Sequence, residues 1–501
     1  MNLVITSEAS RLLARTSRIL AEKGIQSYIV GGFVRDAILG RPTEDIDIAV
    51  RGSGTETAAA VAEALEGRYV LLDSENGMGR VVVHDGVLDF ATMQGDIRED
   101  LERRDFTINT MAIETEKMTD VVVDTKDIID PFHGLQDLEN GILRAVSDSA
   151  FRDDAVRLLR GIRMAAELKF TIDGHTEELI IAESKAIAGV AGERIREELL
   201  KLFSLPDAGD WIKYLDKTGL LAALIPELKQ ARGVEQPHIH VWDVFEHSLQ
   251  TVKAAEFILR ESEIDFAGAK VLDMVPWTEE LKEHFSQVIG NGSTRRSLLK
   301  LAALLHDIAK PQTREIDESG RARFLGHPQE GADMAESIME RLRFSSREIK
   351  LVALLIKYHL RPTQMTHEDL PSNRAIYRYF RDTGESGIDI LYLSLADHLA
   401  TRGPGLELIQ WREHCQMVRH ILEKHGESEK ITPPLKLIDG NDIINLFKIS
   451  PGPRVGTLLE AVREARATGE ISTRQEAVEF IKKTLDEEGY HQSGKDTKGE
   501  A

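Results

Sequence analysis

The stretch YIVGGFVRDAILGRPTEDIDIAV, residues 28–50, decides the fold of the N-terminal part of the chain. Its apolar start predicts a strand, the glycine pair at 31–32 a tight turn, and the residues that follow a helix. A second strand carries Asp45 and Asp47, whose side chains share a face because residues two apart in a strand point the same way. The order strand, glycine pair, helix and strand predicts a mixed α/β unit.

The residue types in this stretch suit phosphate chemistry. Gly31 and Gly32 allow a bulky anion to approach the backbone, and the helix behind them favours negative charge at its N-terminus. Arg35 is placed to contact phosphate oxygens. Asp45 and Asp47 suit two divalent cations that clamp a triphosphate and activate a hydroxyl. A glycine pair alone is usually a turn and Asp-x-Asp alone a solvated strand edge, so their order within one unit is what indicates function.

These motifs, with others further along, resemble the class II tRNA nucleotidyltransferases and bacterial poly(A) polymerases, whose head has a polymerase-β-like nucleotidyltransferase fold. GGFVRD and DID match the first family motif, and residues 103–113 (RRDFTINTMAI) match the ribose-contacting RRD motif. Residues 130–138 (DPFHGLQDL) match the DPxGG segment. Residues 151–168 match the segment with the nucleotide-selecting EDxxR motif, with aspartate in place of glutamate. Residues 192–199 (GERIREEL) match the helix-stabilising ERxxxE motif.

The resemblance implies roles for individual residues. Asp45 and Asp47 would be the catalytic residues and would hold Mg²⁺. The nucleotide would be bound by motif residues, namely Gly31, Gly32, Arg35, Arg104, Asp105, Asn109, Asp154, Arg157 and Arg160. Asp154 and Arg157, three apart and predicted to share a helical face, can read a Watson–Crick edge or form an ordinary surface salt bridge. Asp89 is either a third metal carboxylate or a plain strand acid.

A second group of chemically active residues lies in the helical half. His306 and Asp307 end a strongly apolar helix, where a buried charge is costly unless it is paired or metal-bound. Imidazole and carboxylate donors without thiols suit a hydrolytic divalent metal. The order of these residues resembles the HD phosphohydrolases, which implies metal ligands at His247, His306, Asp307 and Asp397, additional ligands at His327 and His359, and a phosphate contact at Lys310. The metal would be a divalent transition metal or Mg²⁺, and the reaction phosphoester hydrolysis.

The fold class is predicted to be α+β: a polymerase-β-like head of mixed sheet and helices, then an all-helical neck, HD domain and body. After about residue 150, apolar residues recur at three- and four-residue steps, which predicts helices at 152–168, 192–203, 211–224 and 297–309. Residues 261–292 look like an insertion. The predicted boundaries are head 1–142, nucleotide-selecting and tRNA-binding neck 143–230, HD domain 231–400, body 401–490 and disordered tail 491–501.

Composition sets wider limits. A chain of 501 residues suggests three or four domains. The single cysteine, Cys415, excludes a disulfide framework and a multi-cysteine zinc site. No apolar run reaches the roughly 18–20 residues of a membrane span, and the N-terminus has no secretory pattern, so we expect a cytoplasmic protein without a membrane partner.

The charge balance argues on average against nucleic acid, since 63 Lys and Arg against 84 Asp and Glu leave a net charge of −21. Local fields within about 8–10 Å nevertheless decide binding. Arginines gather at positions 157, 160, 163, 194 and 196, so a tRNA partner remains compatible with this composition.

The expected function is therefore maturation or repair of the tRNA 3′ end, with C residues, with or without a following A, added from CTP and ATP without a nucleic-acid template. Only residues 93–98 separate Thr92 from the EDLERRD segment, which is similar to the loop-deleted pattern of CC-adding enzymes. Two alternatives stay open: a poly(A) polymerase of the same fold, and an HD phosphohydrolase whose head only binds RNA. The sequence leaves the oligomeric state open.

Overall fold

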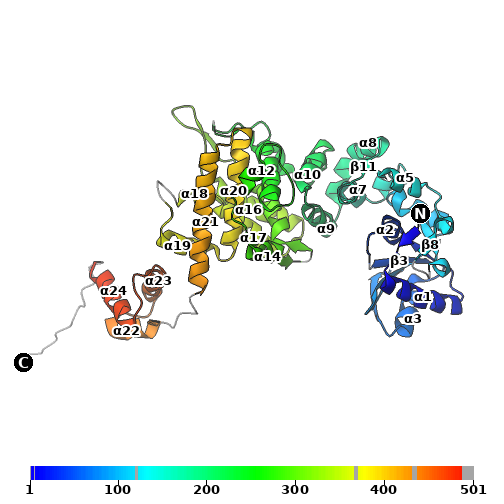
Figure 1. The fold of residues 1–501 in the computed structure, drawn as a ribbon, viewed down its shortest axis with the longest axis horizontal. Helices are drawn as coiled ribbons and strands as arrows, with labels where there is room; N and C mark the ends of the chain where they lie inside the picture. The colour runs from blue at the N-terminus through cyan, green and yellow to red at the C-terminus, as the bar shows by residue number, and fades with distance from the viewer. Residues whose placement is uncertain are drawn as a thin grey trace, which may run out of the picture. The chain divides into compact units, whose positions relative to one another are not determined.

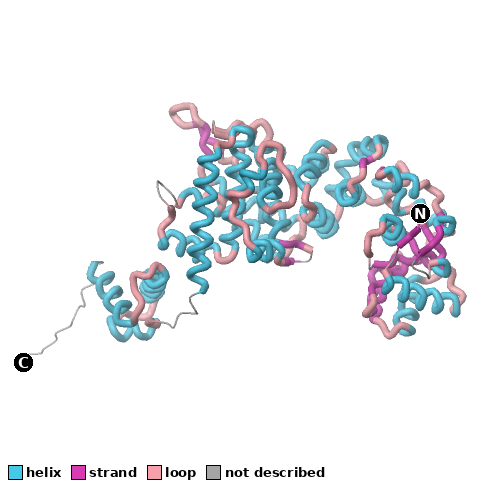
Figure 2. Tube along the Cα trace, viewed as in Figure 1, coloured by secondary structure: helices cyan, strands magenta, loops and turns pink. Residues whose placement is uncertain are grey.

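A computed structural model describes residues 2–4, 6–43, 45–118, 122–237, 239–290, 292–365, 370–430 and 437–487. The chain divides into two compact units, residues 1–226 and 227–501 (Figure 1). Most strands belong to the first unit, and helices make up most of the second (Figure 2). The α+β class is thereby confirmed.

The first unit is built on a seven-stranded sheet in the order β4-β5-β6-β3-β2-β7-β9. Its strands are β2 (Ser27–Val30), β3 (Asp45–Val50), β4 (Arg68–Asp73), β5 (Met78–Val83), β6 (Gly86–Thr92), β7 (Ala112–Glu114) and β9 (Ile128–Ile129). Neighbouring strands are antiparallel except β3 and β6, which are parallel. A further short pair joins β1 (Asn2–Val4) to β8 (Val122–Asp124).

Helices of the first unit attach to this sheet through small and apolar residues. These helices are α1 (Ser7–Glu22), α2 (Gly32–Leu39), α3 (Gly54–Ala64), α4 (Ile97–Glu102) and α5 (Gly134–Asn140). A Cβ built on Gly79 of β5 would lie 2.8 Å from the Cβ of Ala58, so α3 packs directly on this side of the sheet. Figure 1 shows α1 and α3 next to one another beside β3. The turn at the glycine pair and the helix after it confirm the prediction for residues 28–50.

The helices that follow the sheet confirm one prediction and correct two. α9 (Gly192–Phe203) matches residues 192–203. The helix predicted at 211–224 is divided into α10 (Ala208–Lys217) and α11 (Leu220–Leu224), because Gly219 between them has a left-handed backbone (φ 82°). The single helix predicted at 152–168 is wrong, because α6 (Ala150–Asp153) ends before α7 (Val156–Leu168) begins. Asp154 lies between them with an extended backbone (φ −153°, ψ 103°), so Asp154 and Arg157 do not share one helical face.

The remaining elements of this part are α8 (Gly174–Glu183) and a short parallel pair, β10 (Ile142–Leu143) with β11 (Thr171–Ile172). The prediction of a purely helical chain beyond the head is therefore too simple. Two more short antiparallel pairs lie in the second unit: β12 (Val288–Gly290) with β13 (Ser293–Thr294), and β14 (Arg314–Ile316) with β15 (Ala322–Phe324).

A buried carboxylate ties α7 to α9. Glu198 of α9 is only 4% exposed. Its two oxygens accept from Arg160 Nε at 3.3 Å and from Arg163 Nε at 2.9 Å. Arg163 also pairs with Glu167, which bonds Arg41 beyond the end of α2 at 3.0 Å. The sheet-bearing part and the helices after it are thus joined by consecutive ion pairs.

The second unit is a bundle of helices around an apolar core. Its helices are α12 (Val244–Ile258), α13 (Ala269–Leu272), α14 (Glu279–Ser286), α15 (Arg295–Leu305), α16 (His327–Arg341), α17 (Ser346–Tyr358), α18 (Arg361–Gln364), α19 (Asn373–Thr383), α20 (Ser386–Arg402) and α21 (Leu408–Lys430). Residues 261–292, predicted as an insertion, contribute α13 and α14 to this core. Phe285 is fully buried and its ring centroid lies 4.6 Å from that of Tyr392.

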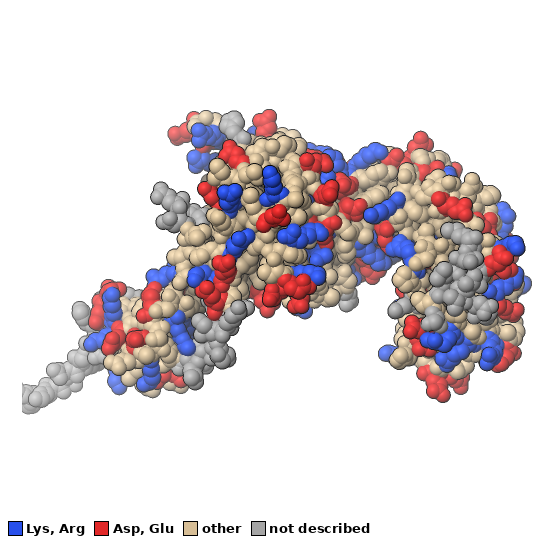
Figure 3. All heavy atoms as spheres, in the orientation of Figure 1, with Lys and Arg blue, Asp and Glu red and all other residues tan. Residues whose placement is uncertain are grey.

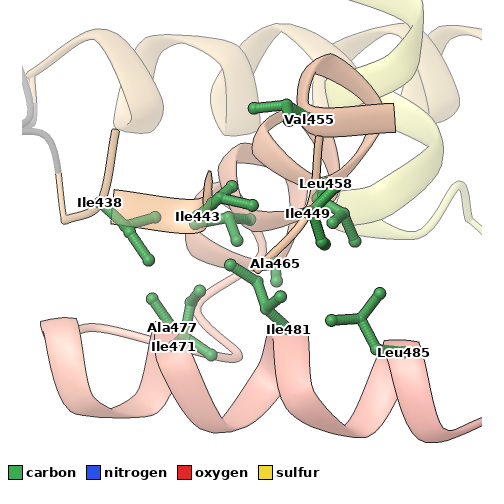
Figure 4. Packing of buried hydrophobic residues seen from close by; sticks show 11 residues of the cluster. Ile438, Ile443, Ile449, Val455, Leu458, Ala465, Ile471, Ala477, Ile481 and Leu485 are labelled. Carbon is green, nitrogen blue, oxygen red and sulfur yellow. The ribbon is translucent and has the colours of Figure 1, made fainter. Parts of the chain in front are cut away.

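Three C-terminal helices, α22 (Gly440–Phe447), α23 (Pro453–Ala467) and α24 (Arg474–Glu487), share a small apolar core. Figure 4 shows Ile443, Leu458 and Ile481 pointing into it. Arg378 of α19 binds both oxygens of Glu464 of α23, at 3.0 and 2.8 Å. The predicted disordered tail lies outside the described residues. None of the helices described is both long and apolar enough to cross a membrane.

Replacing Glu198 by alanine is expected to destabilise the first unit by about 3 kcal/mol, because two arginines lose their buried acceptor. Chemical denaturation of Glu198→Ala measures the change. Glu197→Ala is the matched control, since its exposed neighbour on the same helix should change the free energy of unfolding by less than about 0.5 kcal/mol. Equal effects of the two variants would contradict the role assigned to Glu198.

Candidate active sites

Three carboxylates lie on one face at the centre of the seven-stranded sheet. Asp45 and Asp47 lie on β3, and Asp89 on β6 is in register with Asp47. Burial raises the pKa of Asp47 to about 6; Arg104 opposes this shift, and the charges of Asp89 and Asp45 add to it. Oxygen donors gathered in this way fit a hard divalent cation, which would relieve their repulsion. We call Asp45, Asp47 and Asp89 the carboxylate trio.

The turn beside the trio requires glycine. Gly31 has φ +71°, a conformation that side chains rarely adopt. A Cβ at this position would lie 2.8 Å from Arg104 Nη1 and 3.2 Å from Asp47 Oδ2. Gly32 begins α2. The absent side chain at Gly31 is therefore what lets Arg104 and Asp47 approach the turn.

Hydrogen bonds join several of the predicted nucleotide-binding residues into one network. Arg35 bonds both oxygens of Asp36, at 3.0 and 2.8 Å, and donates to Asn109 Oδ1 at 2.8 Å. Asn109 donates to Asp105 Oδ1 at 2.9 Å, and Arg160 lies 3.4 Å from Asp105 Oδ2. Burial alone would raise the pKa of Asp105, but Arg160 and these hydrogen bonds lower it. Asp105 and Asn109 are buried, and their contacts orient Arg35.

Asp154 and Arg157, the predicted base-selecting pair, are each held by other partners. Arg194 of α9 donates to both oxygens of Asp154, at 3.0 and 2.6 Å. Arg157 donates to the backbone carbonyls of Arg103 at 2.7 Å and Arg104 at 3.0 Å. Arg157 thus links α7 to the RRD segment. The sequence-based site list lacks Arg194, although it belongs to the ERxxxE motif.

Arg80 is a second residue near the trio that the sequence-based list lacks. Its Nε and Nη2 each lie 2.7 Å from an oxygen of Asp89. The sequence indicates this pair only if the register of the β5–β6 hairpin is known, because that register sets Arg80 opposite Asp89. A bidentate pair of this kind fixes the carboxylate firmly.

The second unit brings together all six residues predicted as metal ligands from the HD resemblance. His247 Nε2 lies 3.2 Å from His306 Nε2 and 3.1 Å from Asp397 Oδ1. Asp307 is at the centre, with Oδ2 at 3.2 Å from His306 Nε2 and Oδ1 at 3.3 Å from His327 Nε2. His359 Nε2 is 3.9 Å from the same Oδ1. The HD cluster, as we call it, comprises His247, His306, Asp307, His327, His359 and Asp397.

Backbone carbonyls orient three of these imidazoles. Nδ1 of His306 contacts the carbonyl of Ala303 at 2.9 Å, and Nδ1 of His359 that of Ile356 at 2.7 Å. His327 Nδ1 contacts the carbonyl of Phe324 at 2.6 Å. Each contact occupies Nδ1 and aims Nε2 at the cluster, as is usual for metal-binding histidines.

The electrostatics of the HD cluster also fit a cation. Burial alone would lower the pKa of His306, but the charges of Asp307 and Asp397 raise it to about 10. His306 and Lys310 hold the pKa of Asp307 well below its usual value despite burial. Asp307 Oδ2 is paired with Lys310, whereas within the part of the chain that is described Asp307 Oδ1 and His327 Nε2, 3.3 Å apart, make no hydrogen bond. Buried polar atoms of this kind are the ligands that a metal ion would satisfy.

An open cleft of about 330 Å³ leads to the HD cluster. Lys310 lines it, with Nζ 2.6 Å from Asp307 Oδ2 and from Gln236 Oε1. His240 and Arg323 also line the cleft, and the sequence analysis assigned no role to either. Their positions follow from folding of the loop before α12 and of the β14–β15 hairpin, which no sequence spacing indicates.

Comparison with known proteins agrees with this arrangement. Residues 27–144 match the poly A polymerase head domain, residues 169–232 the probable RNA and SrmB-binding site of polymerase A, and residues 244–402 the HD domain. The chain is 32% identical to the A-adding tRNA nucleotidyltransferase of Deinococcus radiodurans, over 92% of this chain and 95% of that protein. It is also 32% identical to the CC-adding tRNA nucleotidyltransferase of Thermus thermophilus, over 91% and 93%.

Solved structures share the fold. A CCA-adding enzyme in complex with ATP matches with a TM-score of 0.64 and 22% identity, over 96% of both chains. The Thermotoga maritima CCA-adding enzyme complexed with tRNA matches with a TM-score of 0.60 and 23% identity, over 95% of both chains.

The chain belongs to the tRNA nucleotidyltransferase family, and its enzyme class is nucleotidyltransferase. The resemblance found in the sequence is confirmed, including the HD domain. Both the nucleotidyltransferase and the HD families generally use divalent metals.

Gly31→Ala is expected to lower nucleotide transfer at least about 100-fold, because its Cβ would displace Arg104 from beside Asp47. Gly24→Ala is the matched control. Gly24 has a similar positive φ of +65°, but a Cβ there meets nothing within 4 Å. The control should therefore lose only about 1–2 kcal/mol of stability and keep its activity. Equal activities in the two variants, measured at saturating nucleotide, would refute the close approach at Gly31.

Proposed function

We propose that this protein extends the 3′ end of tRNA with nucleotides taken from CTP or ATP, using no nucleic-acid template. The carboxylate trio beside the glycine turn is the observation that carries this proposal. The proposed organisation is a head at 1–142, a neck at 143–230, an HD domain at 231–400 and a body at 401–490. The proposed setting is the cytoplasm.

In the proposed reaction the 3′-hydroxyl oxygen of the RNA forms a bond to the α-phosphorus of the nucleotide. The bond from that phosphorus to the pyrophosphate oxygen breaks, the hydroxyl proton passes to solvent water, and pyrophosphate leaves. Mg²⁺, when bound by Asp45 and Asp47, would lower the pKa of the hydroxyl and offset charge on the transferring group. Gly31, Gly32 and Arg35 would bind the triphosphate.

The other motif residues would orient the nucleotide. Arg104 lies beside the glycine turn, within reach of the same phosphates. Asp105 and Asn109 hold Arg35 and would place the ribose, while Arg160 neutralises Asp105. Asp154 and Arg157 would read the edge of the base by exchanging their present partners, Arg194 and the carbonyls of Arg103 and Arg104, for the polar groups of the base.

The connection between β6 and α4 supports a CC-adding subtype. Only residues 93–96 separate the two elements. Asp96 caps α4, and its side chain and that of Glu99 satisfy each other's backbone amides in a capping box. This closed connection leaves no long loop that could change the nucleotide specificity from C to A.

We further propose that the HD cluster hydrolyses phosphoesters such as 2′,3′-cyclic phosphates, which would repair damaged RNA 3′ ends before extension. His247, His306, Asp307 and Asp397 would hold a divalent transition metal or Mg²⁺, and His327 and His359 would complete the set for a second ion. Such an ion supplies a hydroxide at neutral pH and stabilises charge on the phosphate. Lys310 lies where a substrate phosphate could reach its ammonium group.

The product of the head site tests the first proposal. A tRNA transcript that lacks its CCA end, given CTP and ATP, should gain two C residues, because the short connection after β6 offers no specificity switch. A sequencing gel measures the product. Addition of a terminal A would refute the CC subtype, and a long A tail would refute tRNA end maturation. Asp45→Ala should abolish extension and still bind the tRNA.

A second assay tests the HD cluster. His306→Ala should reduce hydrolysis of 2′,3′-cyclic AMP at least about 100-fold, because it removes a central metal ligand. Treatment with a chelator should have the same effect on the native enzyme. His398→Ala is the matched control: His398 is a largely buried histidine of α20 that stacks on His414, with ring centroids 4.4 Å apart, outside the cluster. Unchanged hydrolysis in His306→Ala would contradict the assigned site.

A further inference from the structure

One face of the sheet edge formed by β4, β5 and β6 is open. Side chains alternate between the two faces of these strands. On the face that α3 covers, Val81 and Leu88 are fully buried. On the opposite face, Val82 is 39% exposed, and Arg80 and Val87 are half-buried. We call this second surface, made by Arg68, Val70, Arg80, Val82 and Val87, the open sheet face.

The open sheet face runs directly into the carboxylate trio. Antiparallel pairing sets Arg80 opposite Asp89, and parallel pairing sets Asp89 opposite Asp47. The same strand pairings place Arg68, Val82, Val87 and Asp45 side by side across the sheet, in the row next to that of Arg80, Asp89 and Asp47. Paired residues in a sheet point to the same side, so the trio and the open sheet face form one continuous surface.

The direction of nucleotide transfer decides what this surface faces. The attacking hydroxyl and the leaving pyrophosphate lie roughly in line, on opposite sides of the phosphorus. Gly31 and Arg35, proposed to bind the triphosphate, follow β2, on one flank of β3. β6, β5 and β4 lie on the other flank. The RNA end that carries the hydroxyl must therefore arrive over β6 and β5.

The chemistry of the open sheet face fits an unpaired RNA strand. Val70, Val82 and Val87 offer an apolar surface against which bases can lie, and Arg68 and Arg80 offer positive charge to phosphates. Arg80 uses Nε and Nη2 to hold Asp89. Its side chain is nevertheless 37% exposed, so the guanidinium can face a phosphate while it orients the carboxylate.

We propose that the open sheet face binds the unpaired 3′ end of the acceptor RNA and that Arg80 positions Asp89 against this strand. The inference rests on the proposed tRNA extension, which supplies the strand to be bound. The partner is a single-stranded ribonucleotide segment, recognised by its phosphates and base faces rather than by its sequence. It occupies the flank of the trio opposite to the triphosphate.

A charge placed on the open sheet face tests the proposal. Val82→Glu should raise the KM for a tRNA transcript lacking its CCA end about tenfold and leave the KM for CTP within about twofold, because repulsion acts on the RNA strand alone. Leu71→Glu is the matched control: Leu71 is 53% exposed on the same sheet edge, but it points to the α3 side, opposite to Val82. The control should change neither constant.

A binding measurement without nucleotide distinguishes failure of this inference from failure of the proposed function. Fluorescence anisotropy with the same transcript, without nucleotide, should show about tenfold weaker binding by Val82→Glu and native binding by Leu71→Glu. If native protein binds the transcript and Val82→Glu binds it equally well, the docking surface is overturned whether or not extension occurs. If native protein binds but adds no nucleotide, the proposed function fails and the surface stands.

Arg80 has its own readout. Arg80→Ala should raise the KM for the transcript and lower kcat, because both a phosphate contact and the orientation of Asp89 are lost. Arg80→Lys should restore the KM and leave kcat low, since a single ammonium cannot hold both carboxylate oxygens. Thermal unfolding of both variants shows whether they fold as the native protein does. An Arg80→Ala enzyme with native KM and kcat would overturn the role of Arg80.

Discussion

The first unit depends on the pairing of buried charges along one continuous network. Glu198 neutralises Arg160 and Arg163, and Arg160 neutralises Asp105. Each of these groups would be costly to bury alone, because its desolvation would be uncompensated. Asp105 in turn holds Asn109, which holds Arg35 beside the glycine turn. The orientation of the proposed triphosphate contacts is thereby coupled to the packing of α7 on α9.

Buried charges must be compensated in the HD cluster too, but there the compensation is incomplete. Asp307 and Asp397 are compensated by imidazoles and by Lys310, yet Asp307 Oδ1 and His327 Nε2 make no hydrogen bond within the described structure. A purely structural network would satisfy those atoms. The surplus indicates a ligand site, whereas the Glu198 network, in which both oxygens are bonded, is a scaffold. The face drawn in Figure 3 carries acidic and basic side chains side by side, so the net charge of −21 does not describe any one site.

Prediction from the sequence succeeded where chemistry is local. The glycine turn, the Asp-x-Asp strand and the apolar helix ending at His306 each depend on neighbours within a few residues. Prediction failed where the conformation or the contacts of a residue depend on a partner far away in the sequence. The helix predicted across Asp154 is broken there, and Arg194, forty residues away, holds the freed carboxylate. The edge strand β4 was not predicted, because its exposed residues lack the alternation that marks a half-buried strand.

Motifs in the sequence identify the family and the two groups of chemically active residues, because each motif keeps its residue types and their order along the chain. How these residues are brought together, and which further residues join them, depends on the fold. Asp89 joins Asp45 and Asp47 because β6 pairs with β3 in one register, and Arg80 reaches Asp89 through the next pairing. Strand register and helix packing bring together side chains that lie tens of residues apart. No local periodicity encodes those distances, so the open face beside the trio could be found only in the folded sheet.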